Sequence, residues 1–179
     1  MTILNQFKLF AGYNKLMNQR MLESAGRLTE EQLKSNRGAF FKSVLGTLNH
    51  ILVGDIIWLK RFHSHPASAK ALEYLNSIEL PSSLDSLLFT DLKGLKAERE
   101  KIDEILINWI ACLSEEDLKD YLSYHNVAGT AQKKLVESLV SHLFLHQVHH
   151  RGQVTTLLSQ SGVDFGETDI LEMIDEHSA

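Results

Sequence analysis

The chain has 179 residues, of which 44% are hydrophobic and 23% charged, an ordinary composition for one globular domain spanning residues 1–179. Its formal net charge is -5 and it has no cluster of lysines or arginines, which argues against nucleic-acid binding. No apolar stretch is long enough to span a membrane and no signal peptide opens the chain, so we expect a cytoplasmic protein without membrane attachment.

Helical signals dominate the first half of the chain. Apolar residues recur at helical spacing, and the only prolines fall in expected connections. Thr29 is the predicted N-cap of a short helix, with Gln32 completing a capping box, and Ser43 is the predicted N-cap of a long one. A long connection over residues 63–81 contains a short helical piece near residues 69–75.

The second half contains two more long helices around an irregular segment. The third helix has an irregular start near Asp91, and residues 121–130 predict a small hairpin or an extended loop. Cys112, the single cysteine, excludes an internal disulfide, and its apolar neighbours predict a buried thiol. Gly162 ends the last helix. We therefore expect an all-α, antiparallel four-helix bundle with long connections, whose main helices cover residues 3–25, 43–62, 84–113 and 131–159.

Histidines on the last helix indicate a metal site. His146 and His150 lie one turn apart on the core-facing seam, where a bundle favours leucine, and His142 and His149 lie on its flank. Two imidazoles that point inward are costly unless they are hydrogen-bonded or bound to a metal. A pair of hydrogen-bonded core histidines is the alternative interpretation.

A third ligand is expected from another helix, and His50 is the best candidate. Gly46 and Gly54 lie four residues before and after it, and glycine is unfavourable inside helices. Such glycines leave space for a substrate or for a close approach of another helix. No Glu-x-x-His lies on the last helix, which argues against a di-iron carboxylate site.

The remaining histidines are expected to be exposed to solvent. His63 and His65 precede Pro66 in the long connection. His125 lies in the irregular segment before the last helix, and for this residue a position at the mouth of the site is the alternative. His177 belongs to a C-terminal tail that we expect to be frayed.

Three short motifs, spread over nearly the whole chain, resemble those of a known protein family. The two motifs that contain histidines are together specific to this family, and the motif nearest the N-terminus is similar to the one in its first helix. The motifs are residues 10–14 (FAGYN), 46–52 (GTLNHIL) and 146–153 (HQVHHRGQ). With these motifs the chain resembles the DinB-like family of bacterial metal-binding bundles, which is related to bacillithiol S-transferases and mycothiol-dependent isomerases.

The resemblance implies a four-helix bundle, often a homodimer, that binds a divalent metal through His50, His146 and His150. Zinc or nickel are the first candidates, and iron or manganese are also compatible with such ligands. In the related enzymes the metal is thought to activate the thiolate of a low-molecular-weight thiol. A small-molecule substrate, such as a thiol of this kind, is the implied partner.

Several other residues are candidates to support the site. His142 and His149 either orient the ligands or face solvent, and Asp55 is either a hydrogen-bond partner of a ligand or a surface charge. Arg151 is expected to form a structural salt bridge, with anion binding or helix capping as alternatives. Asn14 and Asn49 are expected to hydrogen-bond between helices; no catalytic residue is identified.

Two functions remain open. A metal-dependent thiol transferase or hydrolase would use the coordination positions that three histidines leave free. A non-catalytic, stress-related binding protein would instead use a structural metal. Nucleic-acid binding is a weaker third idea, against which the acidic net charge argues.

Overall fold

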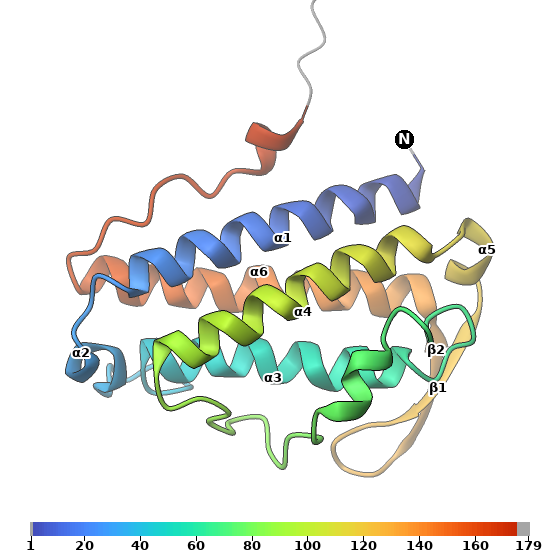
Figure 1. Ribbon diagram of the computed structural model, residues 1–179, viewed down its shortest axis with the longest axis horizontal. Coiled ribbons are helices and arrows are strands. Elements are labelled where there is room, and N and C mark those ends of the chain that lie inside the picture. Colours follow the sequence, from blue (N-terminus) through green and yellow to red (C-terminus); the bar gives the residue numbers. More distant parts are fainter. Residues whose placement is uncertain (1, 175–179) are drawn as a thin grey trace, which may run out of the picture.

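Four long helices form the body of the computed structural model, which describes residues 2–174 (Figure 1). They confirm the predicted all-α bundle, and the shorter elements cap its ends. The long helices are α1 (Ile3–Ala25), α3 (Val44–Phe62), α4 (Leu92–Cys112) and α6 (Val136–Gln160). The short elements are α2 (Glu30–Lys34), the 3₁₀ helix η1 (Glu73–Ser77), α5 (Glu115–Leu118), strands β1 (Tyr121–His125) and β2 (Ala131–Leu135), and the 3₁₀ helix η2 (Ile170–Met173).

The directions of the long helices follow from the contacts between them. Helix α1 runs antiparallel to α4, and α3 runs antiparallel to α6 (Figure 1). Helices α3 and α4 run in the same direction, because the connection over residues 63–91 returns the chain to the end of the bundle where α3 began. The long connections therefore determine the topology of the bundle.

Capping side chains define where most of these helices begin. Thr29 and Gln32 form the predicted capping box of α2, and the Ser43 hydroxyl accepts a hydrogen bond from the Gly46 backbone at 3.0 Å. The third long helix does not begin at residue 84 as predicted, but next to Asp91, where the sequence indicates an irregular start. The Asp91 carboxylate caps the backbone nitrogen of Gly94 at 2.8 Å, so α4 begins at Leu92.

The predicted start of the last helix at residue 131 is also wrong. Residues 131–135 form β2 and pair antiparallel with β1, with Tyr121 opposite Leu135. The turn between the strands contains Gly129 at a φ of 80°, a conformation that favours glycine. The second strand therefore delays α6 to Val136, and Gly162, at a φ of 73°, follows its end as predicted.

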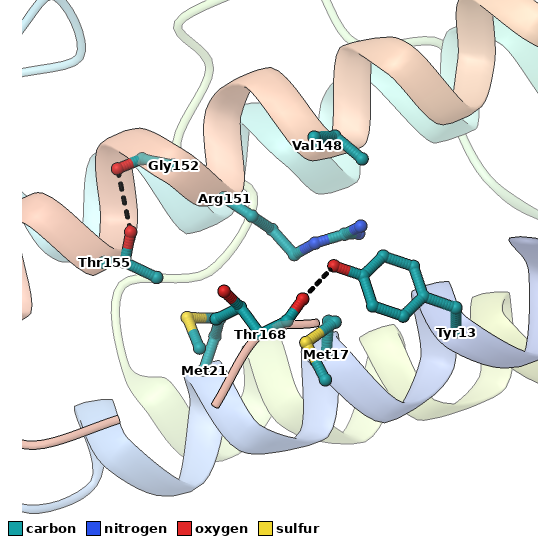
Figure 2. A pocket seen from close by; sticks show the side chains of 8 residues that line it. All are labelled: Tyr13, Met17, Met21, Val148, Arg151, Gly152, Thr155 and Thr168. Atoms are coloured by element: carbon teal, nitrogen blue, oxygen red, sulfur yellow. Dashed lines mark hydrogen bonds between the residues drawn. The ribbon is translucent and has the colours of Figure 1, made fainter. Parts of the chain in front are cut away.

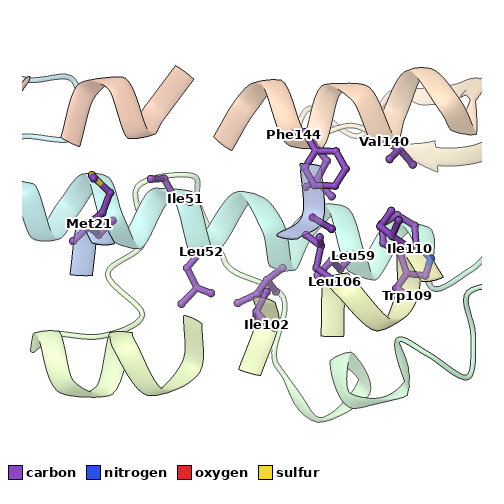
Figure 3. Close-up of a cluster of buried hydrophobic side chains, with 14 of the residues drawn as sticks. Met21, Ile51, Leu52, Leu59, Ile102, Leu106, Trp109, Ile110, Val140 and Phe144 are labelled. Atoms are coloured by element: carbon purple, nitrogen blue, oxygen red, sulfur yellow. The ribbon is translucent and has the colours of Figure 1, made fainter. Parts of the chain in front are cut away.

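Large apolar side chains from all four long helices fill the bundle (Figure 3). Trp109 of α4 is fully buried, and its indole nitrogen donates a hydrogen bond to the Ser68 hydroxyl at 2.7 Å. The connection after α3 is therefore fastened to the core. Cys112, three residues further along α4, is exposed, so the prediction of a buried thiol is wrong: the last turn of the helix directs it to solvent.

A network of charged and amide side chains is also buried in the bundle. Asp55 of α3 accepts hydrogen bonds from Arg99 of α4 and from Gln147 of α6. Arg99 also forms an ion pair with Asp103, with its Nη2 atom 3.0 Å from a carboxylate oxygen. Asn14 of α1 donates to Asp103 at 3.3 Å, which confirms its predicted interhelical role. The network joins all four long helices.

None of the described helices is both long enough and apolar enough to cross a membrane.

Replacing Asp55 with alanine is expected to destabilise the protein by about 3–5 kcal/mol, because Arg99 would lose one of its two carboxylate neighbours in a buried site. Urea unfolding followed by circular dichroism measures the change. Glu30→Ala, which removes an exposed ion pair with Lys34, is the control and should cost less than about 1 kcal/mol. Equal losses in the two variants would contradict the structural role of Asp55.

Candidate metal centre

The structure brings His50, His146 and His150 together between α3 and α6. His50 Nε2 lies 3.2 Å from His146 Nε2 and 3.1 Å from His150 Nε2. One nitrogen from each ring lies within 4.8 Å of the other two. The antiparallel packing of the two helices therefore places the histidines that are far apart in sequence at one point.

Hydrogen bonds at the outer nitrogens determine where two of the rings carry their protons. His50 Nδ1 lies 2.7 Å from the carbonyl oxygen of Leu84, which can only accept, so Nδ1 is the donor. His150 Nδ1 lies 2.9 Å from Gln153 Oε1, which likewise accepts. In the neutral rings, both Nε2 atoms then carry lone pairs that face each other. A lone pair cannot donate to another, so these two nitrogens do not hydrogen-bond to each other, and a cation between them would stabilise the pair.

Burial keeps these imidazoles neutral. It lowers the pKa of His50 and of His150, and burial together with the neighbouring imidazoles lowers the pKa of His146 to about 3. A shared proton is therefore disfavoured at neutral pH. Nitrogen atoms bound to one tetrahedral zinc ion lie roughly 3.3 Å apart, given zinc–nitrogen bonds of about 2.0–2.1 Å. The three residues thus fit a divalent cation.

An aromatic side chain that sequence analysis did not identify covers one side of the triad. The ring of Phe41 stacks on His50, with centroids 3.7 Å apart and an interplanar angle of 14°, and its edge faces His150. The next residue, Lys42, has a φ of 68°, which is unusual for a residue other than glycine. This tight turn into α3 positions Phe41 over the imidazoles.

Both glycines that flank His50 allow other groups to approach closely. A Cβ atom at Gly54 would lie 2.6 Å from His146 Cε1, and one at Gly46 would lie 2.2 Å from the carbonyl oxygen of Phe41. The glycines therefore permit close packing of neighbouring groups and do not leave empty space for a substrate. The space beside Gly54 holds the imidazole of His146.

The flanking residues proposed as supports have different positions. His142 is exposed and packs edge-on against Trp58, while His149 is exposed and lies 3.3 Å from the amide nitrogen of Gln153. Neither hydrogen-bonds directly to a triad histidine. Asp55 is fully buried in the polar network, so it is neither a surface charge nor a hydrogen-bond partner of the triad.

Gln153 and the Leu84 carbonyl instead orient two of the triad histidines. Gln153 follows His150 by three residues, a spacing that places both on one helical face and makes this contact predictable in principle. Leu84 contributes a backbone atom from an irregular connection, for which the sequence carries no signal. Asn49 holds this connection, because its side-chain amide donates to the Phe89 carbonyl and accepts from the Phe89 backbone, both at 3.0 Å.

The other histidines lie away from the triad. His125 is exposed, as predicted, and His63 is half-buried. The prediction of a solvated His65 is wrong, because this residue is buried and its Nε2 lies 3.1 Å from a carboxylate oxygen of Asp120. His177 lies outside the described residues.

Arg151 lies on the face of α6 next to the one that carries His146 and His150. It donates to Asn14 and Gln147, and its guanidinium lies 5.4 Å from the centre of the Tyr13 ring. No carboxylate of residues 2–174 pairs with it, so the predicted salt bridge is wrong. Figure 2 shows Arg151 beside a cavity of about 150 Å³, closed in part by a 2.5 Å hydrogen bond from Tyr13 to the Thr168 carbonyl.

Comparison with known proteins shows the family of the chain. Residues 3–177 match the model of the DinB family. The chain belongs to the DinB family. Its similarity to Protein DinB of Bacillus subtilis (strain 168) is 26% identity over 164 residues, covering 91% of this chain and 90% of that protein. No solved structure matches this DinB-family chain significantly.

Replacing Gly54 with alanine is expected to displace the His146 ring, since the added methyl group would overlap it. Metal affinity should then fall by roughly 10–100-fold, as when a ligand loses its orientation. Competition with a chromogenic chelator measures this loss.

Gly152→Ala on α6 is the matched control, because no atom lies within 4 Å of the added Cβ. It should leave metal affinity unchanged and stabilise the helix by about 0.5–1 kcal/mol. Unchanged metal affinity in Gly54→Ala would show that the close approach of His146 to α3 is not required.

Proposed function

We propose that this DinB-family protein binds one divalent cation through His50, His146 and His150. The observation that carries the proposal is the pair of lone pairs on His50 and His150, which face each other across 3.1 Å. Zinc or nickel are the cations we favour, and imidazole ligands also accept iron or manganese. The supply of metal in the cell then decides which ion is bound.

We further propose that the site is catalytic, of the thiol S-transferase or hydrolase type. Within residues 2–174, no fourth imidazole, thiol or carboxylate joins the three histidines. Three protein ligands leave a position for a substrate or a water molecule, as in catalytic zinc sites. A bound cation lowers the pKa of a thiol or water at that position.

The chain's own residues have a positioning role in this proposal. The Leu84 carbonyl and Gln153 hold two imidazoles in the tautomer that leaves Nε2 unprotonated. Phe41 covers His50 and shields it from water on one side. The substrate would therefore approach from a side that this aromatic ring leaves open.

A structural metal in a non-catalytic, stress-related protein is the alternative function. Structural zinc sites are almost always closed by four protein ligands. The described part of the chain supplies three, which favours the catalytic proposal. Homodimer formation stays a prediction, which light scattering would test, and so does the absence of nucleic-acid binding.

The protein purified with its metal is expected to contain close to one divalent ion per chain, and His146→Ala should lose it. Elemental analysis by mass spectrometry measures the metal content. His149→Ala, which removes an exposed histidine of the same helix, is the control and should retain the metal. Full metal content in His146→Ala would refute the assignment of the ligands.

Cobalt-substituted protein is expected to show a change in its visible spectrum when a small thiol is added, because a sulfur ligand would enter the open position. The spectrum should stay unchanged with the corresponding alcohol. A spectrum that responds to neither thiols nor other small ligands would indicate a closed, structural site.

A further inference from the structure

A cavity of about 460 Å³ lies beside the triad, between the last turns of α3, the connection around residue 84 and the tip of the β1–β2 hairpin. Leu84 belongs to both sites, since its carbonyl oxygen binds His50 and the residue also lines the cavity. Ile57 of α3 lines it too, one turn beyond Gly54, where His146 packs. The cavity therefore adjoins the metal centre. We call it the Arg61 pocket.

The charge of the Arg61 pocket is opposite to that of the whole chain. Lys60 and Arg61 line it, and none of the described residues that line it is Asp or Glu, although the chain carries a formal net charge of -5. The remaining lining is apolar or uncharged, and includes Val127 and His125 of the hairpin tip. A pocket of this kind attracts a small anion with an apolar portion.

Arg61 itself is held without an anionic partner. Its guanidinium lies 4.6 Å from the centre of the Trp58 ring and 4.9 Å from that of Tyr124, so an aromatic side chain from α3 and one from β1 fix it in place. Within residues 2–174, no carboxylate forms an ion pair with it, and burial lowers its pKa. Stacking fixes the plane of a guanidinium and leaves its N–H groups able to bind a carboxylate or phosphate.

The Arg61 guanidinium lies about one helical turn along α3 from the point where His146 packs, a distance that one small molecule could span. Helical side chains lean toward the N-terminus, and Arg61 accordingly lies over Trp58, one turn beyond Gly54 and the adjoining His146. One turn of helix rises about 5–6 Å.

We propose that the Arg61 pocket binds the substrate of the metal centre and that Arg61 recognises a carboxylate or phosphate group on it. The substrate is then an elongated anion whose reacting atom lies at the triad, while its charged end lies at Arg61. This inference rests on the proposed function and adds a specificity residue and a substrate class to it.

Affinities of two matched thiols for the cobalt-loaded protein test the proposal. 6-Mercaptohexanoate carries a carboxylate that can reach Arg61, and 6-mercaptohexanol has the same chain without the charge. We expect the anionic thiol to bind about 10–100-fold more tightly, as hydrogen bonds to charged groups imply. Arg61→Gln should abolish this preference by weakening the anionic thiol much more than the neutral one, whereas Arg61→Lys should keep part of the preference.

Arg27→Gln is the matched control, because it removes the same charge from an arginine that binds the Asp164 carbonyl at the surface. It should retain the preference for the anionic thiol. A preference that persists in Arg61→Gln, or that disappears equally in Arg27→Gln, would overturn the role of Arg61.

A titration without metal separates this inference from the proposed function. Hexanoate, which lacks the sulfur, should shift the nuclear magnetic resonance signals of Ile57 and Val127 in metal-free wild-type protein but not in Arg61→Gln. Such shifts would support the pocket even if the metal assays fail. If the wild-type signals do not respond, the Arg61 pocket is not an anion site, whatever the metal content.

Discussion

The arrangement of this protein depends on nitrogen lone pairs that converge where α3 packs against α6. His50 and His150 each use their outer nitrogen to donate a hydrogen bond, and this leaves the inner nitrogens facing each other. Such a meeting is unfavourable without a cation. The packing of the two helices and the orientation of the imidazoles therefore produce a site that could hold a positive ion.

The buried polar network lies directly behind this site and shares its helix. Gln147 and Arg151 each follow a triad histidine along α6, so the helix presents imidazoles toward α3 on one face and polar groups to the bundle interior on the adjacent face. A rotation of α6 would break both sets of contacts. The hydrogen bonds to Asp55 and Asn14 thus specify the rotation of α6 that brings His146 and His150 to His50.

Helical periodicity and capping residues made much of the fold predictable. The bounds of α1 and the caps at Thr29 and Ser43 depend on local interactions, which the sequence displays directly. The start of α6 was mispredicted because β2 is stabilised by pairing with β1, and pairing between strands is not visible in local propensity. Cys112 was misplaced because an apolar neighbourhood in sequence does not fix the direction of a side chain in the last turn of a helix.

The site was predictable to the extent that its ligands lie on regular helices. Spacing along α6 identified His146 and His150 as neighbours, and the flanking glycines drew attention to His50. The Leu84 carbonyl and Phe41 could not be foreseen, since both belong to irregular segments whose course depends on tertiary packing. The partners of Asp55 and Arg151 could not be predicted, because most of them lie on other helices that are far away in sequence.

The long connection after α3 and the β1–β2 hairpin before α6 lie next to the three histidines but differ from them in structural support. The triad is carried on rigid helices, whereas the walls of the neighbouring cavity come largely from these two irregular segments. Loops accept insertions and substitutions more readily than packed helices do. Substitutions in these two segments can therefore reshape the cavity while the helices keep the three imidazoles in place.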